Sequence, residues 1–375
     1  MKVIFPIENS TMMGGAQHST LALIDAFRKR GHDVVTILPL KGGMHDELKL
    51  NKIQVGNGSR WRFSSKSLLG SIVDCMKVSM AIRRAIASPK DTILYANGIV
   101  AFLYSWLGSR FLGSPVRIVF HERGFACYPL LLLRLTKFIV NNKSAILITT
   151  SEGAAKKWID VGVESSRIRV VYNGINPQAF LPKTKCESDQ IVVGMVARFS
   201  RNKGHADFIQ SAKLLLSTRK RCTFLIVGDV GVAEDDIKYK YEIYDMAHKL
   251  GISDHVIFVG GVTYSNMADS YEKMDIFVNP APLEPFGRSI VEAMMCGLPV
   301  VATAAGGPLE IVKEGVTGFL VPPSDPGALM QKLTILVADE SLRLDMGRRG
   351  RERGLALFNE ENCVSQAVQV CLEPL

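Results

Sequence analysis

Two acidic residues eight positions apart, Glu284 and Glu292, enclose the segment EPFGRSIVE. The preceding segment, residues 275–281 (DIFVNPA), is predicted to be a buried strand, and residues 288–297 (RSIVEAMMCG) are predicted to be a helix. Glu284 is then expected on the loop at the carboxyl end of the strand. Free N–H groups at a helix start can bind an anion, and carboxylates accept hydrogen bonds from hydroxyl groups. The pattern predicts a site for an elongated ligand with hydroxyl groups at both ends and negative charge in the middle.

Two basic residues supply the positive charge that such a ligand needs. Arg198 and Lys203 lie on the turn after the predicted strand 191–197 (IVVGMVA). Arginine offers a forked contact to phosphate and lysine a compact point charge, so both can stabilise a departing diphosphate. A nucleoside diphosphate sugar fits this combination of two carboxylates and two basic residues, with the sugar at Glu284 and the ribose at Glu292. The two carboxylates are up to about 12 Å apart along the helix rise, which argues against a retaining glycoside hydrolase, whose pair lies within about 5.5 Å.

The net charge of the chain, +9, is divided unequally between its halves. Residues 1–185 carry 26 Lys and Arg against 11 Asp and Glu, a net +15, whereas residues 186–375 carry 19 against 25, a net −6. The first half is therefore expected to face something anionic, such as lipid headgroups, a phosphorylated carrier or nucleic acid. Residues 59–87 mix apolar and basic side chains. They fit an interfacial helix on anionic lipid, or equally a core helix with a solvated basic face.

The composition indicates a folded protein of two domains, because 375 residues exceed what one core usually organises and 47% of them are hydrophobic. Residues 3–5 are too short an apolar run for a secretory signal. Neither residues 92–109 nor residues 128–140 form a convincing membrane span. Seven cysteines without CxxC spacing predict reduced thiols and no zinc site. We therefore expect a cytoplasmic protein.

Short apolar strands alternate with helical segments along the whole chain. Twelve strands are expected, in KVIFPI, HDVVTILPL, DTILYA, VRIVFH, AILITTS, IRVVYN, IVVGMVA, TFLIVGD, HVIFVGG, DIFVNPA, LPVVATA and GFLVPP. Strands that lack polar alternation and are joined by helices indicate parallel sheets covered on both faces. The polar segment 181–190 is predicted to be an interdomain linker. Ligand sites are expected at the carboxyl ends of the strands, along a cleft that both domains share.

Five segments make the sequence resemble one known family, the retaining GT-B glycosyltransferases of glycosyltransferase family four. They are EPFGRSIVE, GMVARFSRNKG, VYNGINPQAF with Asn173 and Gly174, GLPVVATAAGGPLEIVKEGVTGFLVPP, and MMGGAQHSTLALIDAFRKRGHDVV. The resemblance implies an α/β protein with the GT-B fold, in which two Rossmann-like, doubly wound parallel-sheet domains face each other across a cleft. An acceptor-binding domain is expected at residues 1–182 and a donor-binding domain at residues 188–358, with a helix at about 359–375 that crosses back to the first domain.

The same resemblance implies that a sugar is moved from a nucleoside diphosphate sugar to an acceptor hydroxyl with retention of anomeric configuration. Neither a metal nor another cofactor is expected. The expected acceptor is a saccharide or a lipid-linked saccharide of cell-surface polysaccharide, lipopolysaccharide or glycolipid synthesis. An anionic membrane surface is a further expected partner, with the protein peripheral at the inner face of the membrane. The sequence leaves the base (UDP or GDP, among others), the sugar, the acceptor and the linkage open.

The resemblance also implies a role for each site residue. Glu284 orients the donor sugar, His121 lies near the reacting sugar, Arg198 and Lys203 bind the diphosphate, and Glu292 binds the ribose. The donor pocket is expected to include Phe286, Gly287, Arg288, Ser289, Gly306, Gly307 and Gly228. A flexible loop with Gly14 and Gly15 is expected to close over the phosphates and the acceptor, because glycine lets a backbone approach a ligand closely.

Two other functions fit parts of the sequence. A GT-B sugar-nucleotide epimerase shares the architecture and would convert a nucleotide sugar with no acceptor present. A basic nucleic-acid-binding protein would use the first half of the chain and would bind any DNA or RNA in a salt-sensitive manner. This interpretation does not explain the segment EPFGRSIVE, so nucleic acid is not an expected partner. HExxH and nucleophile-elbow motifs are absent, and MMGGAQH lacks the GxGxxG of dinucleotide folds, which counts against a dehydrogenase.

Overall fold

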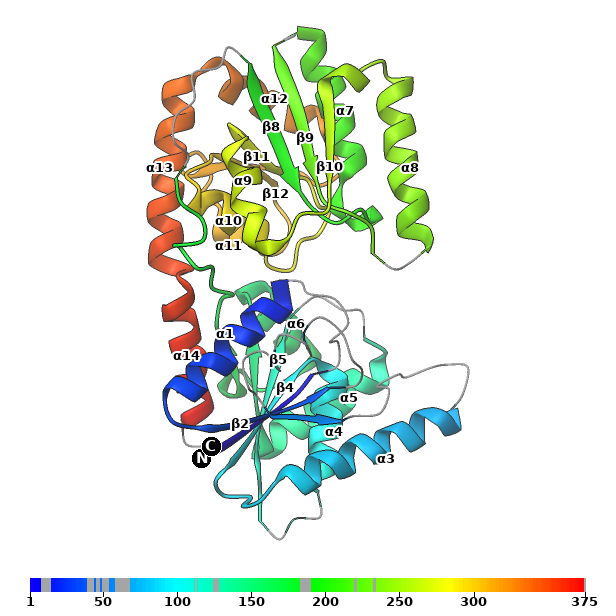
Figure 1. Cartoon of the computed structure of the whole chain (residues 1–375), viewed down its shortest axis with the longest axis vertical. Helices are drawn as coiled ribbons and strands as arrows, with labels where there is room; N and C mark the ends of the chain where they lie inside the picture. Colours follow the sequence, from blue (N-terminus) through cyan, green and yellow to red (C-terminus); the bar gives the residue numbers. More distant parts are fainter. Residues whose placement is uncertain are drawn as a thin grey trace. The chain divides into compact units, whose positions relative to one another are not determined.

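The computed structural model describes residues 1–7, 15–38, 44, 48, 54–57, 68–110, 112, 114–123, 128–182, 190–218, 221–231 and 234–373. The chain divides into two compact units (Figure 1). Unit 1 comprises Met1–Gly174 and Glu361–Leu375, and unit 2 comprises Ile175–Glu360. The change of unit after Gly174 precedes the predicted linker, of which residues 183–189 lie outside the described residues.

Unit 1 contains a parallel sheet of seven described strands in the order β3-β2-β1-β4-β5-β6-β7. The strands are β1 (Lys2–Pro6), β2 (Asp33–Leu38), β3 (Gln54–Asn57), β4 (Thr92–Asn97), β5 (Arg117–Glu122), β6 (Ala145–Thr149) and β7 (Ile168–Val170). The helices are α1 (Gly15–Lys29), α3 (Leu68–Ala85), α4 (Ile99–Ser109), α5 (Leu130–Ile139), α6 (Glu152–Val161) and α14 (Glu360–Leu372), with short turns η1 (Val140–Ser144) and η2 (Ser165–Arg167). The sequence predicts every one of these strands except β3, whose segment QVGN lacks a continuous apolar run.

Most strands of unit 1 are largely apolar because helices cover both faces of the sheet. Ile4 packs in a cluster with residues of α3, α4 and α6, whereas its neighbours Val3 and Phe5 pack on the opposite face with residues of α1 and α14. Helix α14 is therefore part of the unit 1 core, although it follows unit 2 in the chain. Arg117 anchors its end, with Nη1 donating to the carbonyl oxygen of Cys371 at 2.7 Å.

Unit 2 contains a second parallel sheet, with six described strands in the order β10-β9-β8-β11-β12-β13. The strands are β8 (Ile191–Val196), β9 (Cys222–Val227), β10 (Val256–Gly260), β11 (Ile276–Asn279), β12 (Val300–Thr303) and β13 (Gly318–Val321). The helices are α7 (His205–Thr218), α8 (Glu234–Lys249), α9 (Met267–Glu272), α10 (Arg288–Met295), α11 (Pro308–Ile311), α12 (Pro326–Ala338) and α13 (Glu340–Leu357), with short turns η3 (Arg201–Lys203), η4 (Ser253–His255) and η5 (Tyr264–Asn266).

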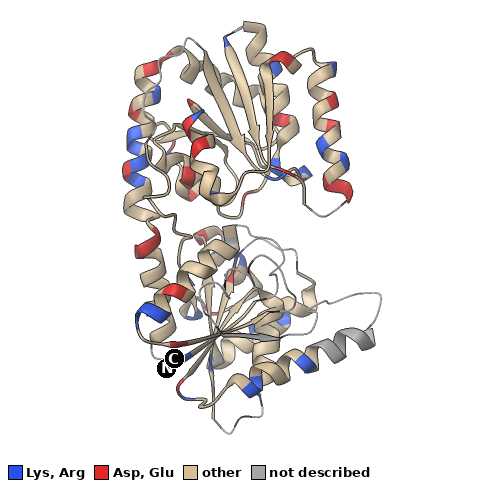
Figure 2. Cartoon of the chain, in the orientation of Figure 1, with Lys and Arg blue, Asp and Glu red and all other residues tan. Residues whose placement is uncertain are grey.

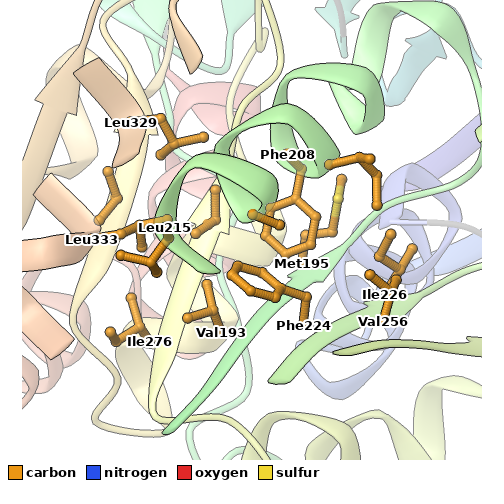
Figure 3. Close-up of a cluster of buried hydrophobic side chains, with 14 of the residues drawn as sticks. Val193, Met195, Phe208, Leu215, Phe224, Ile226, Val256, Ile276, Leu329 and Leu333 are labelled. Carbon is orange, nitrogen blue, oxygen red and sulfur yellow. The ribbon is translucent and has the colours of Figure 1, made fainter. Parts of the chain in front are cut away.

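The core of unit 2 explains why its strands read as continuous apolar runs. Figure 3 shows buried side chains from helices and strands meeting in one cluster: Phe208 and Leu215 of α7, Leu329 and Leu333 of α12, and Val193, Met195, Phe224, Ile226, Val256 and Ile276 of the sheet. The sequence predicts all six strands of this unit. The α/β class with two doubly wound parallel sheets is thus confirmed.

The two apolar segments that could be mistaken for membrane spans have ordinary places in unit 1. Residues 92–109 form strand β4 followed by helix α4, and most of residues 128–140 forms helix α5. Among the helices of the described ranges, none combines the length and the apolar character that crossing a bilayer requires. The five cysteines within the described residues are free thiols, and Cys127 and Cys186 lie outside them.

Candidate functional site

The predicted donor residues of unit 2 follow the carboxyl ends of four neighbouring strands. Arg198 follows β8, Gly228 follows β9, Glu284 follows β11, and Gly306 with Gly307 follows β12. Because β9, β8, β11 and β12 are adjacent and parallel, these residues come to one edge of the sheet. The four strands are labelled in Figure 1. This edge is where open α/β sheets bind ligands.

Lys203 and Glu284 form a direct ion pair at this edge, with Lys203 Nζ 2.7 Å from Glu284 Oε2. The two side chains are 25% and 12% exposed, so the pair is partly shielded from water. A close backbone approach brings the two residues together. Gly204 follows Lys203 with φ of 75°, and a Cβ there would lie 2.0 Å from the carbonyl oxygen of Pro280. Only glycine allows this turn to lie against the loop that carries Glu284.

The loop of Glu284 is also fixed to the loop after β12. The amide of Glu284 donates to the carbonyl oxygen of Ala305 at 3.3 Å, and the amide of Gly307 donates to the carbonyl oxygen of Glu284 at 2.8 Å. A Cβ on Gly307 would lie 2.0 Å from the carbonyl oxygen of Phe286. Gly307 therefore has a structural reason to be glycine, because it lets the two loops pack backbone to backbone. Gly306, with φ of 80°, makes the turn into this contact.

Helix α10 begins at Arg288, directly after this loop, and places Glu292 one turn inside. Gly287 occupies the N-cap position with φ of 107°, and no side chain caps the start of the helix. The carbonyl oxygen of Gly287 accepts hydrogen bonds from the amides of Ile290 and Val291 at 3.0 and 3.2 Å. The side chain of Phe286 is buried and packs edge-on against Phe358, with ring centroids 5.9 Å apart. Phe286 thus positions the loop through packing, and its backbone is the part placed at the helix start.

The carboxylate of Glu292 is buried, but its surroundings are polar. Tyr271 Oη donates to Oε2 at 2.8 Å, and Arg288 Nη2 lies 3.6 Å from Oε1. Burial raises the pKa of Glu292, while the charge of Arg288 and the hydrogen bond from Tyr271 oppose the rise. Tyr271 Oη also lies 3.3 Å from the carbonyl oxygen of Ser289. Tyr271 is a site residue that sequence reasoning missed, since it lies on α9, outside every segment singled out.

The remaining donor residues differ in exposure. Arg198 is exposed, and its Nη1 atom would lie 3.6 Å from a Cβ on Gly231. Within the part of the chain that the structure describes, Arg198 makes no ion pair, whereas Lys203 on the same turn is paired. Gly228 has φ of 148°, and a Cβ there would lie 2.0 Å from the carbonyl oxygen of Ala197. Gly228 therefore allows the ends of β8 and β9 to lie close together.

His121 of unit 1 is buried at the end of β5. Tyr95 Oη and His121 Nδ1 form a short hydrogen bond, and His121 Nε2 has no hydrogen-bond partner within the described ranges. Burial, and secondarily the charge of Arg123, holds the pKa of His121 well below its usual range, so the ring is neutral at pH 7. His121 lines a pocket of unit 1 with residues of α1, the segment after β7, and α14. The full lining is Ser19, Leu23, Tyr95, His121, Arg123, Val171, Tyr172, Asn173, Gly174, Cys363, Val364 and Ala367.

Arg123 extends a hydrogen-bond network across this pocket. Its Nε atom donates to Asn97 Oδ1 at 3.0 Å and its Nη1 atom donates to Asn173 Oδ1 at 2.8 Å. Asn97 Nδ2 in turn donates to Thr20 Oγ1 on α1 at 2.8 Å. Sequence reasoning used Asn173 only as part of a motif and missed Arg123 and Asn97. A signal was available, because Arg123 follows the last residue of β5 and Asn97 is the last residue of β4.

The predicted glycine loop lies only partly within the described residues. Gly14 lies outside the described residues, and Gly15 is the first residue of α1, where its carbonyl oxygen accepts a hydrogen bond from Ser19 Oγ at 3.1 Å. As for metals, no cluster of three or more His, Cys, Asp or Glu residues that could hold an ion occurs in the described segments.

Two family models match the sequence. Residues 13–179 match Glycosyltransferase Family 4, and residues 178–353 match Glycosyl transferases group 1. With two parallel α/β units and these matches, the chain is of the GT-B glycosyltransferase class. It belongs to glycosyltransferase family 4, which confirms the family that the motifs predict.

Several curated relatives are similar over part of their length. The capsular polysaccharide biosynthesis glycosyltransferase CapM of Staphylococcus aureus is 30% identical over 55% of this chain and 53% of CapM. A D-inositol 3-phosphate glycosyltransferase of Corynebacterium urealyticum is 28% identical over 62% of this chain and 57% of the relative. An N-acetyl-alpha-D-glucosaminyl L-malate synthase of Bacillus anthracis is 26% identical over 70% of this chain and 69% of the relative. The chain spans 53–61% of the length of the first curated relatives it matches.

Solved structures share the fold over nearly the whole chain. Anabaena Alr3699/HepE in complex with UDP and glucose matches with a TM-score of 0.83 at 22% identity, covering 99% of both chains. A glycosyltransferase from Rickettsia africae matches with a TM-score of 0.84 at 18% identity, covering 99% of this chain and 97% of the other. These likenesses establish the GT-B fold.

Proposed function

We propose that this chain is a retaining glycosyltransferase that moves a sugar from a nucleoside diphosphate sugar to an acceptor hydroxyl. The observation that carries the proposal is the gathering of Arg198, Lys203 and Glu284 at one edge of the unit 2 sheet, beside the uncapped start of α10. The family membership and the UDP-glucose complex of Alr3699/HepE support a nucleotide-sugar donor.

In this proposal the diphosphate lies at the start of α10, with Arg198 and Lys203 as its counter-charges. The bond between the sugar C1 and the diphosphate oxygen breaks, and the two cations with the helix N-terminus stabilise the charge that develops on the diphosphate. The acceptor oxygen forms its bond to C1 on the same face, and its proton passes to an oxygen of the departing phosphate. Glu284 accepts hydrogen bonds from the sugar hydroxyls once Lys203 has turned to the diphosphate. Glu292 accepts hydrogen bonds from the ribose.

Thermal unfolding against a panel of nucleoside diphosphates tests the donor part of the proposal. A diphosphate at one hundred times its dissociation constant stabilises the protein by about 2.7 kcal/mol, so one base should raise the melting temperature clearly. The corresponding sugar nucleotides are then incubated with candidate acceptors, and NMR coupling constants give the anomeric configuration of the product. A panel without any stabilising nucleotide refutes the proposal. Conversion of the nucleotide sugar with no acceptor present identifies an epimerase instead.

The acceptor proposed is a saccharide or lipid-linked saccharide, with the protein in the cytoplasm and peripheral at the inner membrane face. The name of CapM connects that relative with capsular polysaccharide biosynthesis. On this chain, α3 presents one exposed face with both apolar and basic side chains: Met76, Lys77, Met80, Arg83 and Arg84. Figure 2 shows basic residues along this helix, and the one acidic residue in its sequence, Asp74, precedes this face. Residues 59–67, the beginning of the predicted segment 59–87, lie outside the described residues.

Vesicle flotation tests the membrane part of the proposal. Each basic residue near an anionic surface contributes about 1 kcal/mol, so replacing Lys77, Arg83 and Arg84 by Gln should weaken binding to phosphatidylserine vesicles by ~100-fold. The matched control replaces Lys238 and Lys249, two exposed lysines of α8, and should bind like the parent protein. Failure of the parent protein to float with anionic vesicles, or equal flotation of both variants, removes the membrane partner.

A further inference from the structure

We infer that Tyr271 is a positioning residue for Glu292: its hydroxyl group holds the carboxylate in one orientation, and the preference of the donor site for a ribose over a deoxyribose depends on that contact. The inference rests on the proposed function, in which Glu292 accepts hydrogen bonds from the ribose. Tyr271 acts through Glu292 and not by touching the nucleotide, so it is a residue of α9 that determines specificity at a distance from the ligand.

The ring of Tyr271 is fixed by packing. Its side chain is completely buried. It lies against Phe180 with ring centroids 5.8 Å apart, and against Phe277 of β11 with centroids 5.7 Å apart. Aromatic pairs at these separations are favourable, and a close-packed interior leaves a ring little freedom. Packing therefore places the hydroxyl group of Tyr271 at one position.

The hydroxyl group of Tyr271 has one proton and two acceptors near it. Oη lies 2.8 Å from Glu292 Oε2 and 3.3 Å from the carbonyl oxygen of Ser289. A hydroxyl group donates one hydrogen bond, and the shorter contact is the charge-assisted one to the carboxylate. Burial, and secondarily the charge of Glu292, raises the pKa of Tyr271 well above its ordinary value. The hydroxyl group thus keeps its proton at neutral pH and donates it to Glu292.

Arg288, a second polar neighbour of this carboxylate, is shared with other groups. Its Nη2 atom lies 3.6 Å from Glu292 Oε1, beyond ordinary hydrogen-bond distance. The same atom donates to Tyr264 Oη at 3.3 Å. The charge of Arg288 also opposes the rise that burial causes in the pKa of Glu360. Arg288 therefore supplies positive charge to Glu292, whereas Tyr271 supplies the shorter and directional contact.

This division of contacts leaves Glu292 able to bind a ribose while Tyr271 holds it. An ionised carboxylate has about four lone-pair sites, and Tyr271 uses one of them, on Oε2. A site built to bond a hydroxyl group rejects an analogue that lacks it, because the buried polar group of the protein is then left unpaired. That rejection requires a carboxylate that cannot turn away. Without the hydroxyl group of Tyr271, Glu292 can turn toward Arg288 and should distinguish ribose from deoxyribose less well.

Calorimetry on the full-length protein tests the inference. The ligands are the nucleoside diphosphate that stabilises the protein and its 2′-deoxy and 3′-deoxy counterparts. Tyr271→Phe removes the hydroxyl group and keeps the ring, so the packing is preserved, and Glu292→Gln removes the charge of the proposed ribose contact. The control is Tyr241→Phe, because Tyr241 is an exposed tyrosine of α8. Thermal unfolding without nucleotide shows that each variant is folded.

The parent protein should bind the ribonucleotide more tightly than at least one deoxy counterpart. Tyr271→Phe should reduce this preference by ~10-fold, through weaker binding of the ribonucleotide, because a hydrogen bond to a charged group is lost. Tyr241→Phe should behave like the parent. A full ribose preference in Tyr271→Phe, together with its loss in Glu292→Gln, overturns the inference and leaves the proposed function intact. A ribose preference retained in Glu292→Gln, or absent in the parent, instead refutes the ribose contact of the proposed function, and the inference with it.

The pH dependence of ribonucleotide binding separates positioning from a purely structural role. Burial raises the pKa of Glu292, and the charge of Arg288 and the hydrogen bond from Tyr271 oppose the rise. Tyr264 and Cys296 are the other titratable groups whose charges interact with Glu292. Loss of the Tyr271 hydroxyl group should raise the pKa of Glu292 further, so that on acidification the affinity of Tyr271→Phe begins to fall at a higher pH than that of the parent. Profiles that differ in affinity by the same factor at every pH would overturn the inference.

Discussion

The ion pair between Lys203 and Glu284 leads to a prediction with two opposite effects. In the protein without nucleotide, Glu284 Oε2 holds Lys203 Nζ at 2.7 Å. A diphosphate that binds Lys203 must therefore first take it from Glu284. Glu284→Gln keeps the shape of the side chain and removes its negative charge. The variant should bind the free nucleoside diphosphate more tightly and should transfer sugar more slowly.

The size of both effects follows from the geometry of the pair. Both side chains are at least three-quarters buried, so screening by water is limited. A charge-assisted hydrogen bond of this kind contributes about 1.5–3 kcal/mol, and recovering the lower end of that range tightens binding by roughly 10-fold. Loss of an electrostatic contact to the reacting sugar lowers kcat by ~100- to 1,000-fold.

Calorimetry with the free nucleoside diphosphate gives the affinity, and the rate of diphosphate release in the presence of acceptor gives the turnover. The matched control is Glu242→Gln, which breaks the exposed pair between Glu242 Oε1 and Arg201 Nη2 at 2.8 Å. This control should change neither quantity by more than about twofold, because exposed pairs contribute little. Weaker nucleotide binding in Glu284→Gln, or an unchanged transfer rate, would refute the reasoning about this pair.

Two further predictions concern stability. Burial raises the pKa of Glu122 to about 8, above its ordinary value of 4.5, and Trp158 Nε1 donates to this carboxyl. The folded protein then holds this proton more tightly than the unfolded chain, so its stabilising contribution is full below pH ~4.5 and is lost as the pH rises through ~8. Glu122→Gln should remove this part of the pH dependence of the unfolding free energy, which urea unfolding measures from pH 5 to 9. The same change of unfolding free energy with pH in the variant and in the parent protein contradicts the prediction. Gly307→Ala forces a Cβ to within 2.0 Å of the carbonyl oxygen of Phe286, and thermal unfolding should show a destabilisation of about 2–4 kcal/mol. Gly327→Ala, whose Cβ would meet one side-chain oxygen at 3.3 Å, should be nearly neutral; equal stability of the two variants contradicts the prediction.

The strands were the most predictable part of the structure, because each buried parallel strand is apolar along its length. The segment DIFVNPA predicts strand β11, and the segment RSIVEAMMCG after the loop predicts helix α10. Strand β3 was not predictable in this way, since QVGN has one apolar side chain in four residues. The placement of Arg198 and Glu284 at one sheet edge follows from the same rule, because both lie in segments that follow strands.

The partners of the site residues could not be predicted from the sequence. Lys203 and Glu284 are 81 positions apart, and they meet because Gly204 lies against the backbone of Pro280. Such an approach depends on the three-dimensional path of two loops. Tyr271 reaches the carboxylate of Glu292 from a separate helix for the same reason. Sequence spacing identifies which groups stand at the ends of strands, whereas packing between loops decides which of them touch.

A crystal structure of the full-length protein with its stabilising nucleoside diphosphate would show whether the donor binds at the start of α10. We expect the diphosphate there, in contact with Arg198 and with Lys203 released from Glu284, and the ribose hydroxyl groups beside Glu292. A nucleotide bound elsewhere, or the Lys203–Glu284 pair unbroken with the diphosphate present, would contradict this expectation.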